Sequence, residues 1–155
     1  MTEKQILLTP EGKKRLEAEL KHLLSVRRPQ LAQQLRQAIE DGDLTENSGY
    51  DDAKYEQAFV EGRILTLETL LKEAVVVEDA GASDRVSFGS WVTVMERGGG
   101  KETFRIVGSA EVDPRNSRIS IESPLGKALL DHFVGDKVPV ETPDGLLHFE
   151  ILDIR

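Results

Sequence analysis

Residues 50–74 read YDDAKYEQAFVEGRILTLETLLKEA, and the spacing of their apolar side chains decides the fold of the N-terminal half. Steps of three and four alternate through this stretch, with one polar exception, at Tyr50, Ala53, Gln57, Val60, Ile64, Leu67, Leu71 and Ala74. This is the period of a helix that packs along a partner helix. Residues 50–74 are therefore predicted to form one arm of a coiled coil.

The partner helix is predicted upstream, beginning at Thr9-Pro10-Glu11. Threonine is a favoured N-cap, and proline and an acid both fit the first turn. A helical stripe follows, formed by Leu16, Leu20, Leu24, Arg27, Leu31, Leu35 and Ala38. Pro29 has no N–H to donate, so we expect it to kink this helix or open its hydrogen-bond ladder locally. Two long helices joined by a short polar segment pack antiparallel. Residues 1–77 are therefore predicted to form a long antiparallel coiled-coil hairpin.

The C-terminal half has a different pattern. Residues 78–89 are mostly small and polar and are predicted to be a linker. Beyond them the hydrophobic period changes to two, as in strands, in the segments 91–95, 103–107, 118–122, 137–140 and 148–152. One short helix is predicted to begin at Ser123-Pro124. Residues 90–155 are thus predicted to form a sheet packed on one helix, and the whole chain is α+β.

Composition excludes several kinds of protein. The 155 residues include no cysteine, which excludes a disulfide scaffold, a cysteine nucleophile and a thiolate metal site. The three histidines lack the spacing of metal ligands. No apolar run approaches the roughly 20 residues of a membrane span, and no signal peptide is recognisable. A cytoplasmic protein without a membrane partner is therefore expected.

The charge is unevenly distributed along the chain. The net charge of −8 argues against binding nucleic acid by bulk charge. Residues 13–36 nevertheless hold seven Lys and Arg against two Glu, whereas residues 40–56 hold seven Asp and Glu against one Lys. A basic stretch therefore leads directly into an acidic one, although such runs commonly mark nothing more than a solvated helix face.

Residues 41–50, DGDLTENSGY, form the predicted tip of the hairpin and hold the candidate site. Asp43 and Glu46 are three apart, which in a helical turn places their carboxylates on one face. Mg²⁺ takes hard oxygen ligands, so this pair would bind it weakly and only jointly with another molecule. An alternative, commoner on spacing alone, is a capping box with Asp43 as the N-cap of the second helix and Glu46 as its partner. An EF-hand is excluded because Glu46 occupies the position that requires glycine.

Five separated motifs then point to a known family. They are Thr9-Pro10-Glu11-Gly12, VRRP at 26–29, GDLTEN at 42–47, EGRI at 61–64 and IESPLGKAL at 121–129. In this order the chain resembles, from end to end, the Gre family of bacterial transcript-cleavage and elongation factors, and its acidic composition resembles the GreA type. The resemblance implies that the C-terminal α+β domain is FKBP-like.

The resemblance also implies a function. Such a factor binds RNA polymerase through its secondary channel and stimulates the Mg²⁺-dependent cleavage of backtracked nascent RNA, without turning over alone. Asp43 and Glu46 are then the catalytic tip carboxylates, which hold Mg²⁺ jointly with the polymerase. Contacts with the nascent RNA 3′ end are expected from Arg27, Arg28, Arg36, Tyr50 and Lys54. Contacts with RNA polymerase are expected from an exposed patch around Ser123, Pro124 and Leu125, although the leucine equally fits the core. A monomer is expected.

Two other functions are retained as alternatives. Asp41, Asp51 and Asp52 make the tip more acidic than usual for this family, which fits a related channel-binding inhibitor of RNA polymerase. The intact Asp43-Leu44-Thr45-Glu46-Asn47 pattern favours cleavage. An FKBP-like domain also suggests a peptidyl-prolyl isomerase, but its few aromatic side chains alternate with strand period and are more simply explained as core.

Overall fold

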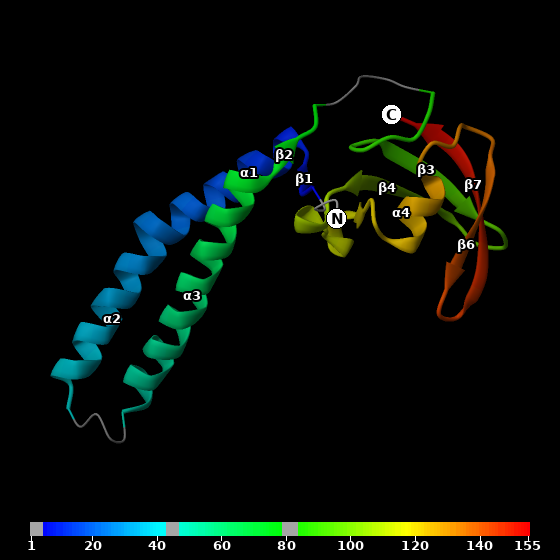
Figure 1. The fold of residues 1–155 in the computed structure, drawn as a ribbon. Coiled ribbons are helices and arrows are strands. Elements are labelled where there is room, and N and C mark those ends of the chain that lie inside the picture. Colours follow the sequence, from blue (N-terminus) through cyan, green and yellow to red (C-terminus); the bar gives the residue numbers. More distant parts are fainter. Residues whose placement is uncertain (1–4, 43–46, 79–83) are drawn as a thin grey trace. The chain divides into compact units, whose positions relative to one another are not determined.

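The computed structural model describes residues 5–42, 47–78 and 84–155 and divides the chain into two compact units (Figure 1). Lys13–Glu73 form the first unit, and Met1–Gly12 together with Ala74–Arg155 form the second. The first is helical and the second is built around a sheet, so the predicted α+β class is confirmed. None of the helices described is both long enough and apolar enough to cross a membrane.

The first unit is a helical hairpin. One arm consists of α1 (Pro10–His22), a π-helical turn η1 (Leu23–Arg27) and α2 (Arg28–Glu40), and the other is α3 (Ser48–Glu73). Figure 1 shows α3 running alongside the first arm. The buried side chains of α2 and α3 are those of the predicted stripes, namely Leu31, Leu35, Ala38, Ala53, Val60, Ile64 and Leu67. Hydrophobic periodicity therefore predicted the seam of this hairpin correctly.

The π-helical turn lies directly before Pro29. Because proline cannot donate to the carbonyl four residues back, the helix widens to an i→i+5 pattern there rather than ending. The Ser25 hydroxyl donates to the Lys21 carbonyl at 2.6 Å in the same turn. The predicted local opening of the ladder at Pro29 is thus confirmed.

The second unit contains a five-stranded sheet in the order β5-β4-β3-β7-β6. Its strands are β3 (Trp91–Glu96), β4 (Lys101–Val107), β5 (Arg118–Ser120), β6 (Lys137–Thr142) and β7 (Gly145–Ile154). Only the β4–β5 pair is parallel among these neighbours. The short helix α4 (Pro124–Leu129) packs on the sheet. Phe104 and Phe149 pack against the core formed by both, which confirms the interpretation of these two aromatic residues as core.

Two short segments join this second unit in ways that the sequence pattern did not predict. Strand β1 (Leu7–Leu8) pairs in parallel with β2 (Val75–Val76). Val86, inside the predicted linker 78–89, is completely buried in the core of the sheet unit. Residues 79–83 lie outside the described part of the chain, but residues beyond them are packed as part of the fold.

A buried carboxylate holds the first residues of α1 within this unit. Thr9 is the N-cap of α1, as predicted, and its hydroxyl accepts a hydrogen bond from the Gly12 N–H at 3.0 Å. The carboxylate of Glu111 accepts hydrogen bonds from the Thr9 N–H, at 2.9 Å, and from the Thr9 hydroxyl. A side chain at position 12 would place its Cβ 1.8 Å from Glu111 Oε1, so glycine there leaves room for the Glu111 carboxylate in this position.

This arrangement predicts that Glu111→Gln destabilises the protein. An amide group replaces one acceptor oxygen by a donor, which then faces N–H and O–H donors in a buried position. We expect the free energy of unfolding to fall by about 2 kcal/mol, measured by urea denaturation. Glu122→Gln, on an exposed side chain that accepts from Ser109, is the control and is expected to change little. Equal stability of the two variants would contradict the assigned role of Glu111.

Candidate functional site

Asp41 fixes the end of α2, on the N-terminal side of the hairpin tip. Its N–H donates to the Gln37 carbonyl at 3.0 Å, and its side-chain oxygen accepts from the Gln37 amide at 3.0 Å. Helix α2 therefore ends in a defined turn immediately before the acidic segment.

Asn47 holds the second side of the tip. Its side-chain oxygen accepts from the Tyr50 N–H at 3.1 Å, which makes Asn47 the N-cap of α3. Its side-chain nitrogen donates to the Ala38 carbonyl, in α2, at 2.7 Å. The half-buried Asn47 side chain thus caps α3 and bonds the end of α2. The end of α2 and the start of α3 are therefore held at fixed positions on either side of the acidic segment.

This geometry corrects one alternative derived from the sequence. The capping box placed Asp43 at the N-cap of the second helix, but that helix begins at Ser48 and its N-cap is Asn47. Asp43 and Glu46 themselves lie outside the described residues, so their mutual geometry stays a prediction. Because Asn47 is the N-cap, Asp43 is not needed to cap α3.

The donor chemistry of the tip fits a cation that is shared with another molecule. Among the described residues, no cluster of three or more His, Asp or Glu could hold a metal ion. Two carboxylates are suitable hard ligands for Mg²⁺, but they are fewer than its octahedral shell needs. Asp43 and Glu46 would therefore hold Mg²⁺ only where a partner supplies further ligands.

Three Arg–Glu pairs tie the two arms of the hairpin together. Arg28 donates to both oxygens of Glu61 at 2.9 and 2.8 Å, and Arg63 donates to both oxygens of Glu19 at 2.7 and 2.9 Å. The third pair joins Arg27 to Glu56. Arg27, the polar interruption in the first stripe, is thus explained by an acid on the facing helix.

The five side chains predicted to contact RNA have different surroundings. Arg27 and Arg28 are engaged in the pairs just described, whereas Arg36 bonds the neutral Gln33 at 2.9 Å. Tyr50 is half-buried in the first turn of α3, and Lys54 is exposed. RNA contact by these residues stays a prediction, but the structure gives Arg27 and Arg28 a structural role as well.

The cross-hairpin pairs shift the acidity of their carboxyl groups. The Arg63 guanidinium, by hydrogen bonds to Glu19, holds the pKa of that carboxyl below its usual value of 4.5. Hydrogen bonds from Arg28 lower the pKa of Glu61 in the same way. A carboxyl whose pKa is lower in the folded chain stabilises it above the unfolded pKa, and this stabilisation is lost as the pH falls through the folded value.

The hairpin is therefore predicted to lose stability in acid, below pH 4.5, through these pairs. We expect the Arg28→Gln, Arg63→Gln double variant to show a smaller decrease in the thermal midpoint than the parent chain between neutral and acidic pH, measured by circular dichroism. Arg36→Gln is the matched control, because its partner Gln33 does not titrate. A pH dependence equal to that of the parent chain in the double variant would show that other groups cause the acid sensitivity.

The residues predicted to contact RNA polymerase begin α4. The Ser123 hydroxyl accepts from the Gly126 N–H at 3.0 Å and donates to the Ser120 carbonyl at 2.7 Å, so it is the N-cap. A Cβ on Gly126 would lie 2.1 Å from the Ser120 oxygen. Leu125 packs against the core, and Pro124 is exposed. Much of this motif thus has a structural explanation, and docking by these three residues stays a prediction.

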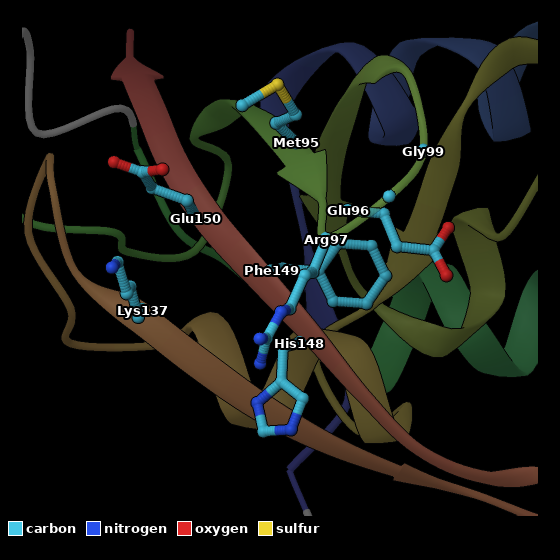
Figure 2. A pocket seen from close by; sticks show the side chains of 9 residues that line it. Met95, Glu96, Arg97, Gly99, Lys137, His148, Phe149 and Glu150 are labelled. Atoms are coloured by element: carbon cyan, nitrogen blue, oxygen red, sulfur yellow. The ribbon is translucent and has the colours of Figure 1, made fainter.

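A concave region lies on the sheet unit, beside the end of β3, the start of β6 and the middle of β7 (Figure 2). It is a hollow of about 530 Å³ whose lining includes the charged side chains of Glu96, Arg97, Lys137 and Glu150 and the imidazole of His148. Figure 2 shows Phe149, Arg97 and His148 between Glu96 on one side and Lys137 with Glu150 on the other. Its lining includes no hydroxyl or thiol, and the reactive groups it offers are the Lys137 amine, the His148 imidazole and the carboxylates of Glu96 and Glu150.

Family patterns match almost the whole chain. The pattern described as "Transcription elongation factor, N-terminal" matches residues 6–76, and the one described as "Transcription elongation factor, GreA/GreB, C-term" matches residues 81–155. The chain belongs to the GreA/GreB family of transcription elongation factors. The family resemblance predicted from the five motifs is thereby confirmed.

Two curated relatives illustrate how close this GreA/GreB factor is to its family. Transcription elongation factor GreA of Thermoanaerobacter pseudethanolicus is 51% identical over 154 residues, 98% of each chain. Transcription elongation factor GreA of Clostridium perfringens is 50% identical over 157 residues, 100% of this chain and 99% of the relative. Among solved structures, GreA factor homolog 1 of Thermus thermophilus is 32% identical, covers 98% of this chain and 99% of its own, and has a TM-score of 0.45.

Sequence analysis of this GreA/GreB factor missed the role of Asn47 at the tip. Asparagine is among the favoured N-cap residues, so its position immediately before the α3 stripe was a usable signal. The bond from its amide to the Ala38 carbonyl had no such signal, because it joins residues brought together only by the hairpin.

Proposed function

We propose that this transcription elongation factor binds RNA polymerase, inserts the tip of its hairpin through the secondary channel and stimulates cleavage of backtracked nascent RNA. The observation that supports it most is the Asn47 bonding. The segment that carries Asp43 and Glu46 is held at both ends by Asp41 and Asn47, and α3 is capped without either acid. Capping of α3 therefore needs neither carboxylate, which supports a role for both in binding a ligand outside the chain.

The proposed chemistry is hydrolysis of an RNA phosphodiester. Water attacks the phosphorus, the bond to the 3′ oxygen breaks, and the retained RNA ends in a 3′ hydroxyl that the polymerase extends. A Mg²⁺ shared with the polymerase would activate the water and stabilise charge on the phosphate oxygens. Asp43 and Glu46 would supply two of its oxygen ligands and orient the water beside them. The factor completes a site in this way and does not turn over alone.

The rest of the chain has supporting roles in this proposal. The hairpin is a rigid carrier, because a seam of buried side chains and three Arg–Glu pairs join its arms. Arg36 and Lys54, together with Arg27, Arg28 and Tyr50, lie along the emerging RNA 3′ segment. The FKBP-like sheet unit docks on the polymerase around Ser123, Pro124 and Leu125. The factor acts as a cytoplasmic monomer.

A cleavage assay tests the proposal. Stalled, backtracked elongation complexes with labelled RNA 3′ ends are incubated near neutral pH with Mg²⁺, with and without the factor. We expect rapid release of short labelled fragments only when factor and polymerase are both present. Slower nucleotide addition without added cleavage would contradict the proposal and indicate the channel-binding inhibitor instead.

A further inference from the structure

Two aromatic side chains on α3 are left in solvent. Tyr55 is 81% exposed and Phe59 is 71% exposed, whereas Val60, Ile64 and Leu67 on the same helix are buried. Four residues apart, they lie on one face of the helix. The buried positions of α3, among them Val60 and Ile64, point to the opposite side. The pair is therefore not required for closing the hairpin.

Two carboxylates adjoin this pair. Asp51 and Asp52 precede Tyr55 by four and three residues, which places them one turn away on the same face. Both are exposed, and neither has an ion-pair partner among the described residues. On the other side, Gly62 leaves open space next to Phe59. We call Asp51, Asp52, Tyr55 and Phe59 the aromatic patch.

The patch lies in the part of α3 that is nearest the tip. At 1.5 Å per residue, Tyr55 and Phe59 are about 10 and 16 Å along the helix from Ser48, where α3 begins. If the tip enters the polymerase as proposed above, these side chains lie inside the channel with it.

From this chemistry we infer that the aromatic patch is a docking surface for an arginine- or lysine-bearing segment of the wall of the RNA polymerase channel. This inference rests on the proposed function, since it assigns a partner surface to the same hairpin. An aromatic face attracts a guanidinium or ammonium group, and a neighbouring carboxylate adds a charge-assisted hydrogen bond. Tyr55 and Phe59 supply the faces, and Asp51 and Asp52 supply the carboxylates.

Charge argues against two other partners for the aromatic patch, which are single-stranded RNA and a second copy of this chain. Single-stranded RNA stacks on exposed aromatic rings where cations accompany its phosphates. Here Asp51 and Asp52 outnumber the one adjacent cation, Lys54, and neither aspartate has an ion-pair partner among the described residues. A second copy of this chain would bring like charges together, because a symmetric contact places the same patch on both sides. A cationic protein surface is complementary both to the aromatic faces and to the carboxylates of the patch.

The test is the affinity of the full-length chain for core RNA polymerase without RNA. We expect the Tyr55→Ala, Phe59→Ala double variant to bind about tenfold more weakly or worse. The Asp51→Asn, Asp52→Asn double variant is expected to bind several-fold more weakly, with a larger loss at low salt. Leu65→Ala is the matched control, because Leu65 is 66% exposed on the same helix but away from the patch, and it should bind as the parent chain does. Circular dichroism checks that α3 is retained, as alanine favours helix.

Three results would overturn the inference. The first is unchanged polymerase affinity in the aromatic double variant. The second is tighter binding by the asparagine double variant that depends on extruded RNA, which would assign the patch to RNA. The third is a concentration-dependent dimer, seen by sedimentation, that the aromatic double variant loses.

The same variants separate this inference from the proposed function. At saturating factor, the aromatic double variant is expected to support cleavage at the parent rate, since it lacks no tip carboxylate. If the parent chain stimulates cleavage but the aromatic double variant binds RNA polymerase as tightly as the parent chain does, the proposed function stands and the inference is wrong. If the aromatic double variant binds more weakly but the parent chain does not stimulate cleavage, the inference stands and the proposed function is wrong.

Discussion

Asp43→Asn is expected to lower stimulated RNA cleavage by about a hundredfold or more at saturating factor. The amide keeps the size of the side chain but removes a negative oxygen from the proposed cation site, so the loss falls on the reaction rather than on docking. Glu46→Gln should have an effect of similar size. Affinity for RNA polymerase is expected to stay within about twofold, because each change is isosteric.

The controls for this prediction come from the same tip. Asp41→Asn removes an equal charge, but the asparagine oxygen still accepts the hydrogen bond from Gln37. We expect it to cleave nearly as well as the parent chain. A comparable loss of cleavage in Asp41→Asn would mean that the overall negative charge of the tip matters, and that Asp43 and Glu46 have no specific role.

Asn47→Ala is expected to have the second-largest effect on cleavage. It removes both the N-cap of α3 and the bond to the Ala38 carbonyl. Loss of an N-cap costs about 1 kcal/mol of stability, which leaves the hairpin folded. The tip carboxylates then lose their fixed position, and a small misplacement of catalytic groups costs about tenfold to a hundredfold in rate. Rate at saturating factor and thermal stability, measured together, check this.

A second variant separates the two roles of Asn47. Asn47→Asp keeps an oxygen that accepts from the Tyr50 N–H but cannot donate to the Ala38 carbonyl. It should keep the N-cap of α3, but its second oxygen faces the Ala38 carbonyl oxygen, so the bond across the hairpin is lost and cleavage is expected to stay impaired. Full recovery of cleavage in Asn47→Asp would show that the cap alone positions the tip and that the bond across the hairpin is dispensable.

Much of this fold could be predicted from sequence because its long elements carry strong periods. The α3 stripe from Ala53 to Leu67 keeps its period with Gln57 as the one polar exception, and proline or glycine marks the turns of the sheet unit. The β1–β2 ladder could not be predicted, since two-residue strands carry no period and their partners are far apart in sequence. Val86 was missed for a related reason, as one buried side chain in a polar run leaves no pattern.

The residues of the candidate site also fall into those that could be predicted from the sequence and those that could not. Asp43 and Glu46 could be selected from their residue types, spacing and family motif, all of which are local properties. The acids that pair with Arg27 and Arg28 could not, because Glu56 and Glu61 are on the other arm and are matched to them only by the register of the hairpin. The family resemblance assigned these arginines to RNA, and no sequence pattern showed the carboxylates that face them.

The most direct test of the central claim is the Mg²⁺ dependence of cleavage in backtracked complexes, measured for the parent chain, Asp43→Asn and polymerase alone. If the tip carboxylates help to hold the cation, the parent factor lowers the Mg²⁺ concentration needed for half-maximal cleavage, and Asp43→Asn returns it to the value of polymerase alone. If the parent chain and Asp43→Asn need the same Mg²⁺ concentration, the tip does not ligate the cation and the proposed mechanism is wrong.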